Sequence, residues 1–530
     1  MRFFNTAGPM RPQKHYCVPP LSRLNLDDLL TLIRNERYFV LHAPRQTGKT
    51  SALLALRDLL NGGAHGDYRC VYVNVEPGQA AREDMTQAMR AILSELELEA
   101  EATLDDPLPA RIWPDLLERA GAAGVLRQVL TRWSLADPTP LVLLIDEIDT
   151  LIGDTLIAVL RQLRAGYAHR PLRFPQSVIL CGVRDVRDYR IHSSAKKTVV
   201  TGGSTFNIKA ESLRIGDFTE AETRALLGQH TAESGQQFAE QALRAVWCLT
   251  AGQPWLVNSL AQQACFRNQD GRDRSRTITA EAIHDAREQL ILRRETHVEQ
   301  LTDKLQEERV RRVIGPLLSG SAAAATMRPD DLQYVRDLGL VARDDPIRIA
   351  NPLYREVIPR DLTWTTQAGF AHDPAWYVDA DGSLNLTRLL AEFQEFFREH
   401  SEHWIERFQY REAGPQLLLQ AFLQRIVNSG DRVEREYGLG RMRTDLLIIW
   451  PAGAPAERTR RMVIECKLLR GSVEETIRTG LEQTRAYLDR CGAAEGHLVI
   501  FDRTEGKPWR DKLFRRERTD GSAPVTVWGM

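Results

Sequence analysis

Two groups of residues have side chains and spacings suited to phosphate chemistry. In the first, Ala43-Pro-Arg-Gln-Thr-Gly-Lys-Thr50 follows an apolar run and precedes a helical run. Backbone amides at the start of a helix bind phosphate oxygens, a lysine adds positive charge, and a hydroxyl can ligate Mg²⁺. In the second, Glu465 and Lys467 lie two residues apart in an apolar run, and Asp445 lies upstream. Because carboxylates are preferred ligands of Mg²⁺, this group is suited to metal-assisted hydrolysis.

The first group has the sequence and the context of a P-loop. We expect phosphate to be bound by the loop and the first helical turn, namely Ala43, Pro44, Arg45, Gln46, Thr47, Gly48, Lys49, Thr50 and Ser51. Lys49 would reach the β and γ oxygens of a nucleotide, and Thr50 would ligate Mg²⁺. Ala43 stands where the first glycine of this motif is usual, whereas Gly48 beside the phosphate is kept.

An acidic pair follows the next long apolar run, Leu141-Val-Leu-Leu-Ile-Asp146-Glu147. Carboxylates at the carboxyl end of a buried strand suit a Walker B motif, in which Asp146 would hold Mg²⁺ and Glu147 would act as general base. The alternative is that the pair only caps a loop. The P-loop upstream favours the Walker B interpretation and predicts nucleotide hydrolysis.

Two further positions fit the same interpretation. Arg184 ends the apolar run after the Walker B motif, and Gly252-Gln-Pro254 lies in a helical region further along. With the P-loop, they make residues 1–362 resemble STAND or AAA-like ATPases. The resemblance implies that Arg184 senses the γ-phosphate, that Pro254 packs on the nucleotide, and that ATP and Mg²⁺ are cofactors of a homo-oligomeric switch. Taken singly, an exposed ion pair and a simple turn would also explain these residues.

The second group predicts a metal centre on a strand. Side chains two apart on a strand share a face, so Glu465 and Lys467 point one way and Cys466 points the other. A hairpin would bring Asp445 beside Glu465. The two carboxylates and the backbone carbonyl of Cys466 would then hold Mg²⁺, or Mn²⁺ in its place, and Lys467 would position or activate water. A solvated strand face is the alternative, but the apolar neighbours indicate a central strand, where unpaired charge is costly.

The helix that follows carries Gln483 and Tyr487 one turn apart on the same face. The set Asp445, Glu465, Lys467, Gln483 and Tyr487 is similar to the PD-(D/E)xK nucleases, and its QxxxY part is similar to RecB-like members. The resemblance implies that Gln483 and Tyr487 lie over a nuclease active site. The sequence does not decide which residue supplies a further acidic ligand of the metal; the candidates are Glu412, Glu434 and Glu436. Gln416 is a further candidate, at a helix position where these nucleases often have a glutamate.

The elements that must position these residues indicate an α/β protein of several domains. Short apolar runs alternate with helical stretches from Arg37 to Phe218, which predicts a parallel, helix-covered sheet. The expected domains are a P-loop ATPase core over 1–218, a helical lid over 219–301, a winged-helix-like module over 302–362 with two short strands, a linker and helix over 363–404, and an α/β restriction-endonuclease-like domain over 405–530. His15, Tyr16 and Pro19 are candidates for the adenine pocket or for a turn.

Composition leaves these functions open. The 530 residues carry 70 basic and 71 acidic side chains, so a nucleic-acid partner, which we expect to be DNA, must bind a local patch. Candidate patches are Lys507–Arg516 and the pair Arg441 and Arg443. Seven scattered cysteines, no leader and no membrane-spanning run predict a cytoplasmic protein without a membrane partner. We therefore expect an ATP-regulated, Mg²⁺-dependent DNA nuclease of defence or genome maintenance. The alternatives are an ATP/ADP switch with a degenerate nuclease fold as sensor, and a DNA translocase.

Overall fold

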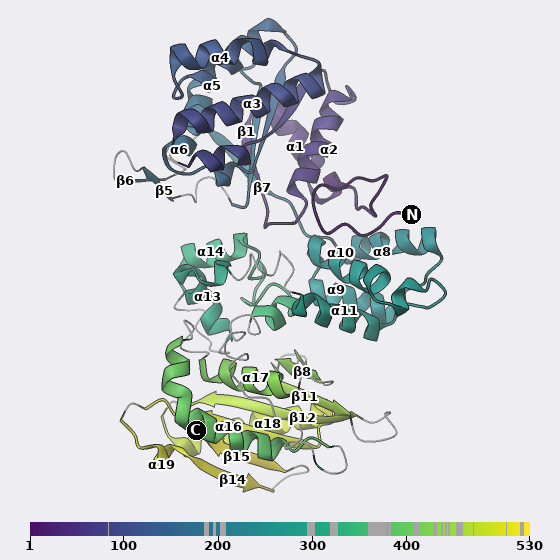
Figure 1. The fold of residues 1–530 in the computed structure, drawn as a ribbon, viewed down its shortest axis with the longest axis vertical. Coiled ribbons are helices and arrows are strands. Elements are labelled where there is room, and N and C mark those ends of the chain that lie inside the picture. The colour runs from purple at the N-terminus through teal and green to yellow at the C-terminus, as the bar shows by residue number, and fades with distance from the viewer. Residues whose placement is uncertain are drawn as a thin grey trace. The chain divides into compact units, whose positions relative to one another are not determined.

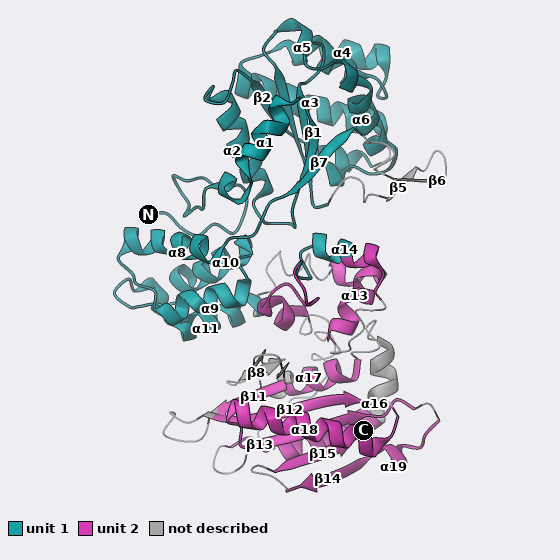
Figure 2. Cartoon of the chain, turned by 180° about the vertical axis from the view of Figure 1, so that it is seen from behind, with its two compact units in different colours: residues 1–295, 333–343 teal, residues 296–332, 344–530 magenta. Residues whose placement is uncertain are grey.

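The structure is a computed structural model that describes two compact units (Figure 2). One unit comprises residues 1–295 with 333–343, and the other comprises 296–332 with 344–530. The described residues are 1–82, 84–184, 190–193, 198–201, 208–293, 303–318, 327–358, 379, 383–407, 414–427, 432–435, 438–439, 442–443, 446–451, 459–469, 471–504, 506–519 and 524–530.

A five-stranded parallel sheet forms the centre of the first unit (Figure 1). Its strands are β1 (Tyr38–His42), β2 (Arg69–Asn74), β3 (Leu141–Asp146), β4 (Ser177–Gly182) and β7 (Lys209–Arg214), in the order β2-β3-β4-β1-β7. The apolar runs of β1, β3 and β4 are buried along their whole length, as expected where helices cover both faces of a sheet. The predicted parallel sheet is confirmed.

Helices pack on the two faces of this sheet. The helices α1 (Leu26–Arg34) and α2 (Lys49–Asn61) share a core with one face. The other face is covered by α3 (Met85–Leu104), α4 (Leu108–Ala120), α5 (Val125–Ala136) and α6 (Gly153–Gly166). An antiparallel hairpin of β5 (Arg190–Ser193) and β6 (Thr198–Thr201) follows β4. The sequence analysis did not predict it.

The chain after Thr219 is helical, with α8 (Glu220–Ser234), α9 (Glu240–Thr250), α10 (Pro254–Gln262) and α11 (Ala280–Leu292). A capping box starts α8: the Thr219 hydroxyl accepts from the Glu222 amide, and the Glu222 carboxylate accepts from the Thr219 amide. The helices α13 (Glu308–Leu318) and α14 (Pro329–Asp337) follow. The two strands expected after α14 are reduced to single bridge residues at Val341 and Ile349. Pro346 between them has no amide to donate, which disfavours a ladder.

A six-stranded mixed sheet forms the centre of the second unit, in the order β14-β15-β13-β12-β11-β8. Its strands are β8 (Arg432–Arg435), β11 (Leu446–Pro451), β12 (Thr459–Leu468), β13 (Glu495–Phe501), β14 (Phe514–Arg518) and β15 (Val525–Gly529). The short strands β9 (Gly438–Leu439) and β10 (Met442–Arg443) pair with each other. The strand β12 is central, antiparallel to β11 and parallel to β13. The last two strands were not predicted.

Helices also cover both faces of this second sheet. On one face α16 (Leu386–Arg407) and α17 (Gly414–Val427) share a core with Met462, Ile464 and Cys466. On the other face α18 (Val473–Cys491) packs against Val463 and the alternate residues of the neighbouring strands. The short helix α19 (Trp509–Lys512) precedes β14. None of the helices in the described parts of the chain is long and apolar enough to span a membrane.

Candidate functional site

The P-loop lies between β1 and α2, and its lysine is folded into the loop. The Lys49 ammonium is buried and donates to the carbonyl oxygens of Ala43 and Pro44, at 3.2 Å in each case. Gly48 has a φ of +86° and caps α2. This left-handed backbone favours glycine, and a β-carbon here would lie 2.8 Å from Nη2 of Arg23, so the end of the Arg23 side chain would have to shift.

The predicted Mg²⁺ ligands Thr50 and Asp146 meet at the carboxyl ends of the strands. The Thr50 hydroxyl donates to Oδ2 of Asp146 at 2.7 Å, and the carboxylate is fully buried. The Tyr72 hydroxyl, on the neighbouring strand β2, donates to the same oxygen at 3.1 Å. Sequence reasoning missed Tyr72, because nothing in its spacing from Asp146 signals the contact. The Glu147 amide donates to Oδ1 at 2.9 Å, so protein groups orient both carboxylate oxygens.

Glu147, the predicted general base, follows β3 with a left-handed backbone at φ 55°. Strain of this kind in a residue other than glycine is often retained at functional sites. Burial is the largest cause that raises the pKa of its carboxyl; Lys49 opposes the rise, and the charges of Asp146 and Asp149 add to it. A base must be deprotonated, so activity that depends on Glu147 is present above this raised pKa and is lost as pH falls through it.

Replacing Asp149 by asparagine is expected to shift the acid limb of ATP hydrolysis to lower pH. The substitution removes one of the charges that raise the pKa of Glu147. An asparagine oxygen can still accept the hydrogen bond that the Val183 amide donates to Oδ1 of Asp149 at 3.3 Å, so the local fold is kept. The measurement is kcat against pH for both proteins. A limb that stays in place, or moves to higher pH, contradicts the assignment of Glu147 as the base.

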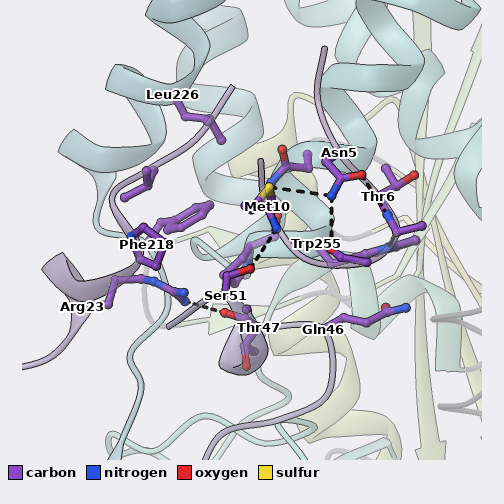
Figure 3. A pocket seen from close by; sticks show the side chains of 17 residues that line it. Asn5, Thr6, Met10, Arg23, Gln46, Thr47, Ser51, Phe218, Leu226 and Trp255 are labelled. Carbon is purple, nitrogen blue, oxygen red and sulfur yellow. Dashed lines mark hydrogen bonds between the residues drawn. The ribbon is translucent and has the colours of Figure 1, made fainter. Parts of the chain in front are cut away.

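A pocket beside the P-loop is formed largely by the N-terminal segment and the helical region (Figure 3). Gln46, Thr47, Gly48 and Ser51 line it, and so do Asn5, Thr6, Ala7, Gly8, Met10, Val18, Pro20, Arg23, Phe218, Leu226, Pro254, Trp255 and Asn258. The Met10 amide donates to the Ser51 hydroxyl at 3.0 Å, and the Trp255 indole donates to the Thr6 carbonyl at 2.9 Å. Pro254 lines this pocket, as do Val18 and Pro20, whereas the adenine-pocket candidates His15, Tyr16 and Pro19 do not.

Arg23 contacts three segments of the chain at this pocket. The sequence analysis did not identify it as a site residue. Its Nη1 donates to the carbonyl of Thr47 at 2.6 Å and to that of Gly216 at 3.0 Å, and its guanidinium lies 5.3 Å from the Phe218 ring centre. Burial is the main cause that lowers the pKa of this arginine. No motif marks Arg23, since its partners are brought to it only by the tertiary fold.

The Gly252-Gln-Pro254 motif has a steric origin. Gly252 has a φ of +78°, and a β-carbon there would lie 2.0 Å from the Phe218 carbonyl oxygen. The Gly252 carbonyl also accepts from the Phe218 amide at 2.9 Å. The glycine thus lets the turn before α10 lie against Phe218, which lines the pocket together with Pro254.

Replacing Gly252 by alanine is expected to destabilise the first unit by about 1–3 kcal/mol from backbone strain alone, and further from the clash with Phe218. Since Pro254 follows two residues later, ATP affinity should fall with it. Thermal unfolding and binding of a fluorescent ATP analogue measure the two effects. The control is Gly228→Ala, a helical glycine whose β-carbon would meet nothing within 4 Å. Equal behaviour of the two variants contradicts the steric account.

Arg184 lies against residues 333–343, which belong to the same compact unit. Its guanidinium lies 4.8 Å from the ring centre of Tyr334. In the same segment, a β-carbon on Gly339 would lie 2.7 Å from a ring carbon of Pro44, so this segment packs closely on the P-loop. Arg184 and the P-loop therefore contact the same segment, residues 333–343. The sequence analysis assigned this segment to the winged-helix-like module.

The donor set fits a nucleotide with Mg²⁺. Lys49 is held by loop carbonyls that phosphate oxygens can replace, and Thr50 and Asp146 present a hydroxyl and a carboxylate, the hard oxygen ligands that Mg²⁺ prefers. A parallel sheet with this loop after β1 and a carboxylate at the end of β3 defines a P-loop nucleotide-binding domain.

Comparison with known proteins agrees with this class. Residues 33–189 match the family described as AAA domain, so this part of the chain is an AAA-type P-loop ATPase domain. Similar solved structures include a Walker-type ATPase of Pyrococcus abyssi, at 15% identity and TM-score 0.44, covering 67% of this chain and 99% of that one. Cdc6p of Pyrobaculum aerophilum is 18% identical, with TM-score 0.36, 68% and 96% covered. Drosophila ORC bound to DNA is 11% identical, with TM-score 0.34, 72% and 80% covered. No curated protein matches.

The second predicted centre lies on β12. The Glu465 side chain is 4% exposed, and the Lys467 ammonium donates to its Oε1 at 2.6 Å. Cys466 belongs to the core on the α16 and α17 face, so Glu465 and Lys467 lie on the α18 face. The central strand that the apolar neighbours predicted is therefore present, and it carries a buried carboxylate paired with a partly exposed lysine.

Gln483 and Tyr487 lie on α18, the helix that covers this face. Tyr487 is buried in the core that α18 forms with the sheet. Oε1 of Gln483 is buried and accepts no hydrogen bond from the residues that the structure describes. A buried amide oxygen without a donor suits a cation that the structure does not contain, because an oxygen ligand satisfied by a metal needs no other partner. Glu465 and Lys467 thus lie on the sheet face that is covered by α18, the helix that bears Gln483 and Tyr487.

Several predicted residues lie outside the described part of the chain. Asp445 is one of them, as are Glu412, Glu436 and Arg441, and the side chains of Glu434 and Arg443 are not described. Leu446, the residue after Asp445, pairs with Ile464, the residue before Glu465. In the described ranges, no group of three acidic, histidine or cysteine residues forms a metal site. Gln416 is buried on α17, which covers the opposite face of the sheet.

The basic cluster Lys507–Arg516 is largely engaged within its own domain. Lys507 donates to the buried Asp502 carboxylate at 2.6 Å, and Arg516 pairs with Glu474 at 2.7 Å. Lys512 lies over Trp509, with the ammonium 5.1 Å from the ring centre. These contacts favour the solvated-surface alternative over a phosphate-binding patch for most of this cluster.

Proposed function

We propose that the chain is an ATP-regulated, Mg²⁺-dependent nuclease that cleaves phosphodiester bonds of DNA. The observation that carries this proposal is the buried Glu465 carboxylate, paired with Lys467 on a central strand beneath a helix that bears Gln483 and Tyr487. These are residue types that suit metal-assisted hydrolysis, and they come from two parts of the sequence pattern, in the expected order.

A structural role alone explains this ion pair poorly. Taking the Glu465 carboxylate out of water costs several kcal/mol before its attraction to the partly exposed Lys467 ammonium is counted. A central strand could bury an apolar residue at position 465 instead. That it buries a carboxylate there, paired with Lys467, is expected where the charges bind a metal and a phosphate.

The proposed roles follow from the chemistry of each side chain. Glu465 and Asp445 would hold Mg²⁺ with the Cys466 carbonyl. The pairing of Leu446 with Ile464, which are their neighbours in the sequence, supports this proposal. When bound, the metal would lower the pKa of water and stabilise charge on the phosphate. Lys467 would orient the attacking water, and Gln483 would supply a further oxygen or hold the substrate.

The AAA domain would supply the regulation. Lys49 and Thr50 would bind the phosphates and Mg²⁺, Asp146 would hold the metal, and Glu147 would accept a proton from the attacking water. Arg184 and Pro254 would report the nucleotide state, because Arg184 stacks on residue Tyr334 and Pro254 lines the pocket. We propose a cytoplasmic homo-oligomer in which ATP and ADP favour different arrangements of these segments.

The test is cleavage of linear and circular DNA by the purified full chain with Mg²⁺, with EDTA, and with ATP or ADP. Cutting is expected with Mg²⁺ and is expected to disappear in a Glu465→Ala variant. Unchanged cutting by that variant excludes this centre. DNA binding without cutting in any metal supports the alternative, a switch whose nuclease fold has become a sensor.

A further inference from the structure

A second strongly basic surface lies on the AAA domain, away from the P-loop. An open groove runs between α5 and α6, two helices on one side of the parallel sheet (Figure 1). Arg127 and Arg132 of α5 and Arg161 of α6 line it, together with Gln128. None of these residues lines the pocket beside the P-loop.

A buried glutamine fixes the shape of this groove. Gln162 is 4% exposed; its Oε1 accepts from the Arg127 amide at 3.2 Å, and its Nε2 donates to the Ala122 carbonyl at 3.1 Å. These two hydrogen bonds tie the first turn of α5 to α6. The guanidinium groups of Arg127 and Arg161 therefore project from helices whose relative position is held, and not from a mobile loop.

The groove carries positive charge that nothing nearby neutralises. Arg127, Arg132 and Arg161 are exposed, and none of them makes an ion pair with any residue in the described ranges. Neither α5 nor the loop 121–124 before it contains an aspartate or a glutamate. Three unpaired guanidinium groups facing one groove favour an anionic ligand.

We propose that this groove binds the phosphate backbone of double-stranded DNA. Guanidinium groups match phosphate geometry, and the Gln128 amide adds a neutral donor of the kind that contacts DNA backbones. The remaining lining is small, with Ala123, Gly124 and Ala165, so the groove has no aromatic platform for unstacked bases and no apolar anchor pocket for an acidic peptide. Binding would be independent of sequence. The proposal rests on DNA as the substrate of the proposed nuclease, but not on cleavage.

The test is the salt dependence of binding of the full chain to a fluorescent duplex in EDTA, where no cutting occurs. Replacing Arg127, Arg132 and Arg161 together by glutamine is expected to weaken binding by at least 10-fold near physiological salt. The slope of log K against log salt should become shallower by about 2.7, since each lost phosphate contact removes about 0.9. Replacing the same three by lysine should restore most of the slope, which excludes misfolding as the cause.

The matched control removes the same charge elsewhere on the domain, with Arg90, Arg111 and Arg119, all exposed, replaced by glutamine. This control should bind duplex almost as the unaltered protein does. An equal loss in the control, no loss in the groove variant, or competition by polyglutamate as strong as by DNA would each overturn the proposal, the last in favour of an acidic polypeptide. Because Mg²⁺ is absent, these outcomes are independent of whether Glu465 supports cutting.

Discussion

A variant with Glu465→Gln and Lys467→Met together is expected to be folded and stable but unable to cut DNA. The two substitutions keep the size of both side chains while they remove both charges from the α18 face of β12. Only the carboxylate of this pair is buried, and replacing such a pair by neutral groups of similar volume is often neutral or stabilising. A metal ligand is lost, however, and cleavage should fall by more than the roughly 10–100-fold typical of residues that only support a ligand.

The single variant Glu465→Gln separates the structural role of Glu465 from its chemical role. Glu465→Gln alone leaves the Lys467 ammonium beside a neutral amide, so unfolding free energy should fall by about 1–3 kcal/mol. The double variant should recover that loss without recovering activity. Thermal unfolding, Mn²⁺ binding by electron paramagnetic resonance, and plasmid cleavage measure the three quantities. A double variant that cuts as fast as the unaltered chain would show that Glu465 is not a ligand of the reacting metal.

Much of the fold follows from short-range patterns. Strands β1, β3 and β4 are apolar on both faces because helices cover both faces, and this is visible as continuous apolar runs. The same logic placed β12 at the centre of its sheet. Thr50 and Asp146 could be paired from the sequence because the carboxyl ends of parallel strands meet at one edge, where the P-loop also begins.

The contacts that sequence reasoning missed all depend on long-range packing. Arg23 reaches Thr47 and Gly216 only after the N-terminal segment has folded over the loop. Tyr72 bonds Asp146 because β2 and β3 are neighbours, and no rule of spacing gives that order. The strand β15, Val525–Gly529, inserts between β13 and β14, although its sequence is short and follows a charged stretch. Each case needs the neighbours of a strand or loop, which local patterns do not contain.

The two proposed centres also differ in how well the sequence could locate them. The P-loop carries its own backbone geometry, so Gly48 and Lys49 identify it wherever it occurs. In the second centre Glu465 and Lys467 are ordinary strand residues, and only burial distinguishes them from a solvated pair. The burial of Glu465 and the unsatisfied oxygen of Gln483 therefore add evidence that the motif alone could not give.

Glu147→Gln is expected to bind ATP and Mg²⁺ but to hydrolyse ATP about 10²–10⁴-fold more slowly, the range typical for loss of a general base. The amide keeps the shape of the carboxylate, and the hydrogen bond between Thr50 and Asp146 does not involve the Glu147 side chain. Steady-state ATP turnover and equilibrium binding of a fluorescent ATP analogue separate the two effects. Lys49→Ala should lose both, because it removes the charge inside the loop.

Glu76→Gln is the matched control, since Glu76 is an exposed glutamate of the same domain and should change neither quantity. If Glu147→Gln turns over ATP normally, water is activated by another group, and the pKa of Glu147 that burial and the neighbouring carboxylates raise has no part in catalysis. If it loses ATP binding instead, the left-handed backbone at Glu147 and its neighbours shape the Mg²⁺ site and the base lies elsewhere.

A trapped ATP state would also show whether nucleotide controls cutting: if hydrolysis only resets the switch, this variant should cut DNA with ATP as fast as the unaltered chain, or faster.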